Sequence, residues 1–136
     1  MNPVVQEDDY GCGVACVANI LGVEYEKAIV LLGKDGKKRA MTFGFHCKEL
    51  ARALKLGGID YSNKYIKQKD KRRIYEDGAI VFIKRSKKYR AGHFLSRKKG
   101  MWYDSWINFP HEKRIAGVRK RLPGRPIYMI FPIDKT

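Results

Sequence analysis

The sequence QEDDYGCGVAC at residues 6–16 decides the fold. In it Cys12 stands between two glycines, directly before an apolar run that continues to Leu21 and stops at Gly22. This pattern predicts a largely buried helix over residues 13–21. The unpaired N–H groups and the positive dipole at the start of such a helix favour a thiolate. The thiolate is the nucleophilic form of cysteine, so the stretch predicts a reactive thiol at the entry to a buried helix.

Outward from this helix, the chain changes from helical to extended patterns. Apolar residues at helical spacing predict helices, and short apolar runs bounded by glycines predict strands. The predicted helices cover residues 13–21, 25–32 and 42–57, the last capped by Thr42, and the predicted strands cover residues 59–66, 79–83, 91–96, 101–104 and 126–132. Helices followed by strands indicate an α+β domain, with N-terminal helices packed on an antiparallel sheet. We expect one domain over residues 1–136.

Three more side chains supply the other parts of a thiol nucleophile. His93 begins one predicted strand, Asp104 ends the next, and residues 97–100 form the turn between them. Antiparallel pairing brings the two side chains together, so that His93 can hold the thiol proton while Asp104 orients its ring. Six residues before Cys12, the Gln6 amide can donate a hydrogen bond to an oxyanion, together with the backbone N–H of the nucleophile.

The stretch from Gln6 to Cys16 resembles the nucleophile motif of the bacteriocin-processing peptidases that remove double-glycine leaders, a family of the papain-like cysteine peptidase superfamily. In that family a Gln, five residues and then Cys-Gly-x-Ala open the first helix. Gly92-His93-Phe94 is similar to the family's His motif, and Asp104, after Met101-Trp102-Tyr103, is similar to its orienting Asp. Residues 42–57 resemble its third helix, and the resemblance covers roughly residues 4–131.

The resemblance implies a papain-like fold and a cysteine peptidase that uses a Cys12, His93 and Asp104 triad with Gln6 as oxyanion donor. The chain departs from the family at Ser105, because proline commonly follows the Asp, and it carries no transporter segments. These departures point to a substrate other than a double-glycine leader, such as another peptide, an isopeptide or a ubiquitin-like tail. Acyl transfer in place of hydrolysis is the variant reaction.

The charge balance points to anionic partners. The chain has 29 Lys and Arg against 14 Asp and Glu, a net charge of +15, in basic runs spread along its length. Such a surface attracts nucleic acid, an acidic protein or an acidic peptide substrate, or it is simply a solvated basic surface. The alternative function is therefore a catalytically silent basic module that binds nucleic acid or an acidic protein. Tyr89 and Arg90 could stack on bases there, or belong to a solvated loop.

The remaining cysteines and histidines suggest no second site. Three cysteines without an export signal predict free thiols in a cytoplasmic protein, and no apolar run is long enough to span a bilayer. Cys16 and Cys47 are predicted to pack in the core. A zinc site built from these two thiols with Cys12 and His46 fits no common spacing, so we expect no metal and no cofactor. His111 stands in no motif.

Aromatic residues surround Asp104 in the sequence. Trp102 is predicted to pack in the core of the sheet. Trp106 can lie either in that core or in the wall of a substrate cleft, and the sequence leaves both possibilities open.

Overall fold

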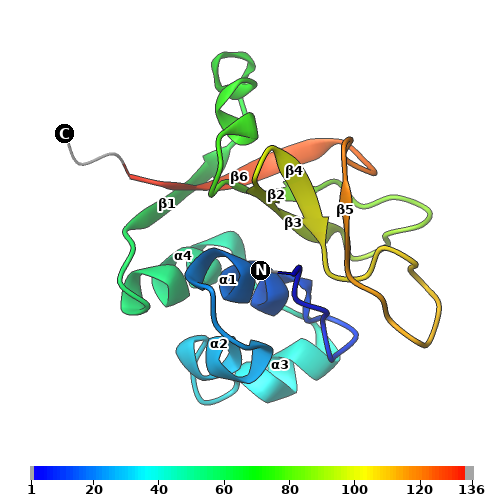
Figure 1. Cartoon of the computed structure of the whole chain (residues 1–136). Coiled ribbons are helices and arrows are strands. Elements are labelled where there is room, and N and C mark those ends of the chain that lie inside the picture. Colours follow the sequence, from blue (N-terminus) through cyan, green and yellow to red (C-terminus); the bar gives the residue numbers. More distant parts are fainter. Residues whose placement is uncertain (1, 134–136) are drawn as a thin grey trace.

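The computed structural model describes residues 2–133 and consists of a helical layer packed on one sheet (Figure 1). The helices are α1 (Cys12–Leu21), α2 (Tyr25–Leu31), α3 (Gly36–Thr42) and α4 (Cys47–Leu56). The strands are β1 (Tyr61–Tyr65), β2 (Ile80–Ile83), β3 (His93–Lys98), β4 (Met101–Asp104), β5 (Gly117–Arg119) and β6 (Pro126–Pro132). The sheet has the order β1-β6-β2-β3-β4-β5, and all neighbours pair antiparallel. The predicted α+β architecture is confirmed.

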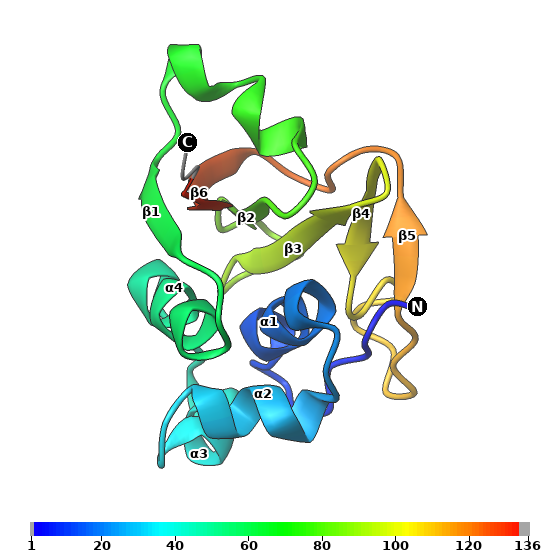
Figure 2. The same ribbon diagram turned by 60° about the vertical axis from the view of Figure 1, so that its left-hand side comes forward.

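Helix α1 is the centre of the helical layer. Figure 2 shows it beneath β3, with α4 beside it and α2 below. Its apolar residues from Val14 to Ala18 are almost completely buried, as the apolar pattern predicted, and Gly22 ends the helix in the left-handed conformation. A Cβ at Gly13 would lie only 3.0 Å from Leu50 of α4 and 3.4 Å from Phe94 of β3. Glycine therefore lets the first turn, which carries Cys12, approach both neighbouring elements closely.

The helix predicted over residues 42–57 is confirmed over α4, but its predicted start and its cap at Thr42 are wrong, because a separate helix, α3, ends at Thr42. Thr42 is the last residue of α3, and its hydroxyl donates a hydrogen bond back to the carbonyl of Lys38 at 2.7 Å. Gly44, with a φ of 81°, then turns the chain away from the helix. A new helix starts after His46, whose N–H donates to Glu49 Oε1 at 2.8 Å. The break lets residues 43–45 line the same cavity as Cys12.

The hairpin of β3 and β4 is confirmed, with a tighter turn than residues 97–100. Lys98 pairs with Met101, and only Lys99 and Gly100 form the loop, with φ angles of 52° and 73°. Two positive φ angles match the twist of a two-residue hairpin. The hairpin carries His93 and Asp104 at its open end, where the sheet meets α1.

The opposite face of the sheet has its own apolar core. Val81, Ile83, Leu95, Trp102 and Met129 are its fully buried members. Ile74 reaches this core from residues 66–79, which we call the projecting lobe and which stands out at the top of Figure 1. The predicted charged loop at residues 67–73 lies in this lobe, which contains the 3₁₀ turns η1 (Gln68–Asp70) and η2 (Arg73–Tyr75). Trp102 is completely buried here, as predicted.

Candidate active site

The structure brings together three of the predicted residues from the two layers. Cys12 is the first residue of α1, and its Sγ accepts a hydrogen bond from the backbone N–H of Phe94 at 3.4 Å. His93, the first residue of β3, directly precedes Phe94 and lies close enough to Cys12 for the thiol group to raise the pKa of its imidazole. Its Nε2 lies 2.8 Å from Oδ1 of Asp104, the last residue of β4. Since Nε2 faces the carboxylate, Nδ1 is the ring nitrogen left for the thiol.

The charges of this group stabilise one another. Burial favours a neutral imidazole, but the hydrogen bonds and negative charges of Asp104 and Cys12 outweigh it and raise the pKa of His93 to about 9. Burial also favours a protonated carboxyl, but hydrogen bonds from His93 and Arg119 lower the pKa of Asp104 to about 2. At neutral pH the pair is therefore an imidazolium and a carboxylate, both almost completely buried.

Arg119 of β5 is a further partner of Asp104 that sequence reasoning missed. Its Nε donates to Asp104 Oδ2 at 2.7 Å, while the backbone N–H of Trp106 donates to Oδ1 at 3.0 Å. Both carboxylate oxygens are thus engaged, and the carboxylate plane is fixed. In the sequence, Arg119 is the first of three consecutive basic residues and only the last residue of a three-residue strand, so nothing distinguishes it from a solvated cation.

Aromatic rings cover the imidazole. The Tyr89 ring stacks on His93 with centroids 4.8 Å apart and an interplanar angle of 12°. Because Tyr89 is only 2% exposed, it is not available to stack on a nucleobase, whereas Arg90 is exposed. Trp106 packs edge-on against Phe109 and lines the cleft, which answers the question that the sequence left open. These rings exclude water from the His93–Asp104 hydrogen bond.

Gln6 is buried beside the thiol and is held by a residue next to Asp104. Its Oε1 accepts a hydrogen bond from the Ser105 hydroxyl at 2.7 Å, and its backbone N–H donates to the Ser105 carbonyl at 3.2 Å. Its Nε2 donates to the carbonyls of Asp8 at 2.8 Å and Asp9 at 3.3 Å, and the second of these bonds is the longer and weaker. Ser105, which departs from the family pattern, therefore fixes the orientation of the amide.

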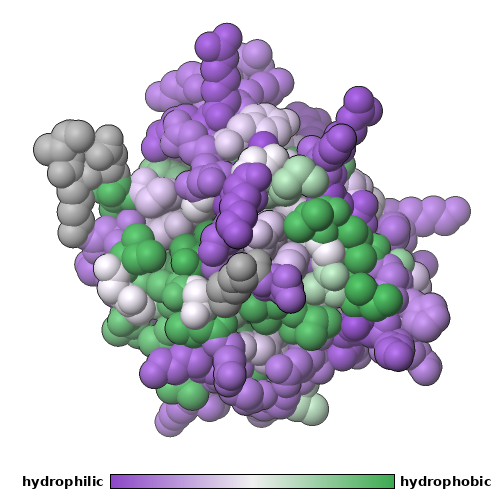
Figure 3. All heavy atoms as spheres, in the orientation of Figure 1, coloured by the Kyte–Doolittle hydropathy of each residue, from purple (hydrophilic) through white to green (hydrophobic). Residues whose placement is uncertain are grey.

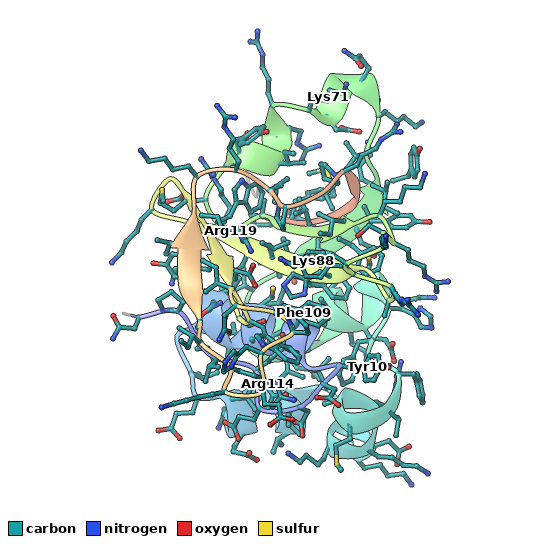
Figure 4. All side chains as sticks on the ribbon, turned by 90° about the vertical axis from the view of Figure 1, so that its right-hand side faces the viewer. Tyr10, Lys71, Lys88, Phe109, Arg114 and Arg119 are labelled. Carbon is teal, nitrogen blue, oxygen red and sulfur yellow. The ribbon has the colours of Figure 1, made fainter. Side chains whose placement is uncertain are left out.

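A cleft of about 540 Å³ opens over these residues and reaches Gln6, Cys12 and His93. Its walls include eight aromatic residues: Tyr10, Phe43, Phe45, Phe82, Tyr89, Phe94, Trp106 and Phe109. Lys88 and Arg90 are the cations of its lining, and Asp9 is its carboxylate. Figure 4 shows Tyr10, Lys88 and Phe109, which come from three separate segments, around the same opening.

The other predicted cysteines and histidines lie outside this cleft. Cys16 is buried in the core, and burial raises the pKa of its thiol well above the ordinary value. Burial also raises the pKa of Cys47 to about 11. His46 precedes α4, and His111 is exposed, with its Nδ1 accepting a hydrogen bond from the N–H of Lys113 at 3.2 Å. Within residues 2–133, no group of three or more His, Cys, Asp or Glu is placed to hold a metal ion.

Comparison with solved structures finds a protein of similar fold. A double-glycine motif protease from an AMS/PCAT transporter, solved in complex with the leader peptide, superposes with a TM-score of 0.55 at 18% sequence identity. The match covers 97% of this chain and 91% of that chain. No protein-family model and no curated protein matches the sequence. In the part of the chain that the structure describes, no helix is both long and apolar enough to cross a bilayer. The chain therefore has the α+β fold of a papain-like cysteine peptidase.

Proposed function

We propose that this protein is a cysteine peptidase or a closely related thiol acyltransferase, with Cys12 as nucleophile, His93 as acid and base, and Asp104 as the residue that orients His93. The observation that carries the proposal is that Cys12 and His93 line the same cleft, with Cys12 Sγ bonded to the N–H of Phe94 and His93 hydrogen-bonded to Asp104. The fold shared with a protease supports it. A thiol that only fills the core needs neither a buried imidazolium partner nor an open approach.

The reaction follows from the protonation states. The Cys12 thiolate attacks the carbonyl carbon, and a C–S bond forms while the carbonyl oxygen becomes an oxyanion. His93 gives its proton to the leaving amine as the C–N bond breaks, which leaves a thioester. The neutral imidazole then takes a proton from water, or from an acceptor amine in the transferase variant. The water or amine that has lost this proton attacks the thioester, and the C–S bond breaks. The acyl group leaves, and the Cys12 thiolate and the His93 imidazolium are restored. The raised pKa of His93 keeps it protonated, ready for the first transfer, at neutral pH.

Gln6 is proposed to stabilise the oxyanion together with the backbone N–H of Cys12. Support for this role comes from its position in the cleft wall and from the Ser105 hydroxyl, which donates a hydrogen bond to the carbonyl oxygen of the amide. The Nε2 hydrogen that makes the 3.3 Å bond to the Asp9 carbonyl is the one available to a stronger acceptor. A negatively charged oxygen is such an acceptor.

The cleft lining suggests the class of substrate. Eight aromatic residues favour apolar side chains near the scissile bond, and Lys88 and Arg90 favour carboxylates beside them. Asp9, the carboxylate of the lining, is already paired with Arg114. We therefore propose a peptide or protein substrate with apolar and acidic residues around the bond.

Selective alkylation tests the thiolate. With iodoacetamide at about pH 6, an ordinary thiol is almost wholly protonated and reacts slowly. We expect Cys12 to be labelled at least tenfold faster than Cys47, whose pKa is raised to about 11 by burial, and faster than buried Cys16. Peptide mass spectrometry of the native protein gives the three rates. His93→Ala should remove the preference, and equal slow labelling of all three thiols would remove the basis of the proposal.

The role of Gln6 predicts a graded pair of variants. Gln6→Ala should lower the acylation rate by about 10²-fold, the usual cost of losing an oxyanion donor. Ser105→Ala keeps the amide but removes the hydroxyl that holds its oxygen, so its loss should be smaller and in the same direction. The burst of p-nitrophenolate released from p-nitrophenyl acetate measures acylation, and urea unfolding controls for stability, since both residues are buried. A Gln6→Ala burst as fast as that of the wild type argues against the oxyanion role.

A further inference from the structure

A second cavity lies between the projecting lobe and β6, away from the cleft. Its volume is about 220 Å³. Its apolar lining comes from Ile66, Ile74, Pro126 and Ile127, and its polar lining from Tyr65, Tyr75, Lys71 and Arg125. Backbone hydrogen bonds fix its walls, from Ile66 N–H to the Ile127 carbonyl at 2.9 Å and from Lys84 N–H to the Arg125 carbonyl at 2.7 Å. No residue of the peptidase site lines it.

The charges around this cavity are mostly positive. Residues 64–73 contain six Lys and Arg and one carboxylate, Asp70, which Lys64 neutralises at 3.1 Å. The rest of the lobe adds two carboxylates, Glu76 and Asp77, and Asp77 accepts hydrogen bonds from the N–H groups of Lys99 and Gly100. Lys67, Lys69, Lys71 and Arg72 are exposed, and none of them makes an ion pair within residues 2–133. Arg125 faces them from the opposite wall of the cavity, and the lining contains no carboxylate. In Figure 3, hydrophilic side chains gather at the top of the molecule, where the lobe projects.

Two tyrosines give the same site exposed aromatic surface. Tyr65 is 55% exposed and Tyr75 is 54% exposed. Other rings support both of them from behind: Tyr65 packs edge-on against Tyr128 at 5.8 Å, and Tyr75 packs edge-on against Trp102 at 5.9 Å. Large tyrosine surfaces exposed in a soluble protein, supported by packed rings and set among unpaired cations, are typical of surfaces that bind single-stranded nucleic acid.

We propose that this cavity and the projecting lobe bind single-stranded nucleic acid, with one base held against Tyr65 and Tyr75 and the flanking phosphates on Lys71 and Arg125. The cavity is small, has an apolar floor and is open between cations, which suits a flat ring that carries a phosphate on either side. An acidic peptide would use the cations but would offer an aromatic ring only at occasional positions, whereas every nucleotide carries a ring next to its phosphate. Figure 4 shows Lys71 on the lobe, well apart from Lys88 and Phe109 at the cleft, so both sites can be occupied together.

Fluorescence anisotropy with a labelled uridine or thymidine oligonucleotide tests the site at several salt concentrations. Each lost phosphate contact on a single strand lowers the slope of log K against log salt by about 0.7, so Lys71→Ala/Arg125→Ala should reduce it by about 1.4. At fixed salt the same variant should bind at least tenfold more weakly. Lys27→Ala/Lys34→Ala removes two exposed cations from the helical layer and is the matched control, which should bind nearly as the wild type does.

The aromatic part of the proposal has its own test. Tyr65→Ala should weaken binding about tenfold, while Tyr65→Phe, which keeps the ring, should bind as the wild type does. Thermal unfolding of the four variants controls for folding. Equal losses of affinity in the two double variants would overturn the assignment. Full binding by Tyr65→Ala, together with displacement of the oligonucleotide by poly-glutamate, would overturn it in favour of an acidic protein. Because Cys12→Ala leaves this site intact, its oligonucleotide affinity should be unchanged whether or not the thiol is catalytic.

Discussion

Cys12→Ala is expected to abolish acylation and turnover, a loss of about 10⁴-fold or more, while the protein stays folded. No other described thiol can replace Cys12, because Cys16 is buried in the core and Cys47 lies outside the cleft. The measurement is the p-nitrophenolate burst, with trapping of the acyl-enzyme by mass spectrometry and cleavage of a proteome-derived peptide library. Cys47→Ala makes the same chemical change at a thiol outside the cleft and should keep full activity.

The Cys12 variant also has a readout that needs no substrate. Negative charge on Cys12 is one of the causes that raise the pKa of His93 to about 9. Burial of the ring lowers the pKa of His93, and without the charge on Cys12 less opposes this effect. We therefore expect the NMR titration of His93 in Cys12→Ala to shift to lower pH. An unchanged titration would show that the two groups do not form an ion pair, and retained turnover in the folded variant would end the peptidase proposal.

Asp104→Asn is expected to shift the pH dependence of both activity and stability. The neutral amide no longer stabilises the imidazolium, so the pKa of His93 should fall from about 9 and the alkaline limb of the acylation profile should move to lower pH. Near pH 8.5 we expect a loss of about 10²-fold. Since the pKa of His93 in the wild type is raised from 6.5, its ion pair stabilises the fold fully below pH 6.5 and ceases to do so as the pH rises through 9. Urea unfolding at pH 6.5 and at pH 9 should show that the free energy of unfolding depends less on pH in the variant than in the wild type.

Arg119→Gln distinguishes this electrostatic effect from a general disturbance of the site structure. The guanidinium neutralises part of the charge of Asp104, so its loss should move the pKa of His93 upward, opposite to the effect of Asp104→Asn. Arg119→Lys keeps the charge and should leave the pH profile near that of the wild type. If Arg119→Gln moved the alkaline limb to lower pH, as Asp104→Asn does, the guanidinium would act by holding the carboxylate in place and not through its charge.

The sequence was most informative where periodicity and burial agree. The run after Cys12 is apolar on every side, and only a helix buried between other elements suits it. The hairpin was predictable because a Lys-Gly pair stands between two strand-like runs. The order of His93 and Asp104 along that hairpin then indicated their meeting, which the structure shows at 2.8 Å.

Other parts of the site depend on contacts that a linear pattern does not contain. Helix α3 begins in the basic run at residues 34–39 and buries little besides Ala40, so its amphipathic signal is weak. Gly44 separates it from α4 by a backbone conformation, without any change in composition. Arg119 belongs to an edge strand of three residues, too short for alternation to show. Its role appears only when β5 pairs with β4 and brings it to Asp104.

The division of the site between two layers has a consequence for synthesis of the chain. The thiol is made early on the ribosome, but Phe94, which donates to its sulfur, is 82 residues later, and Ser105, which holds Gln6, follows Gln6 by 99 residues. A nascent chain therefore carries Cys12 without the imidazole that shares its proton or the hydroxyl that aligns the amide. Under the proposed mechanism, Cys12 gains these partners only after the hairpin of β3 and β4 has packed on α1. Folding of the sheet onto the helical layer is then the step that makes the proposed nucleophile competent.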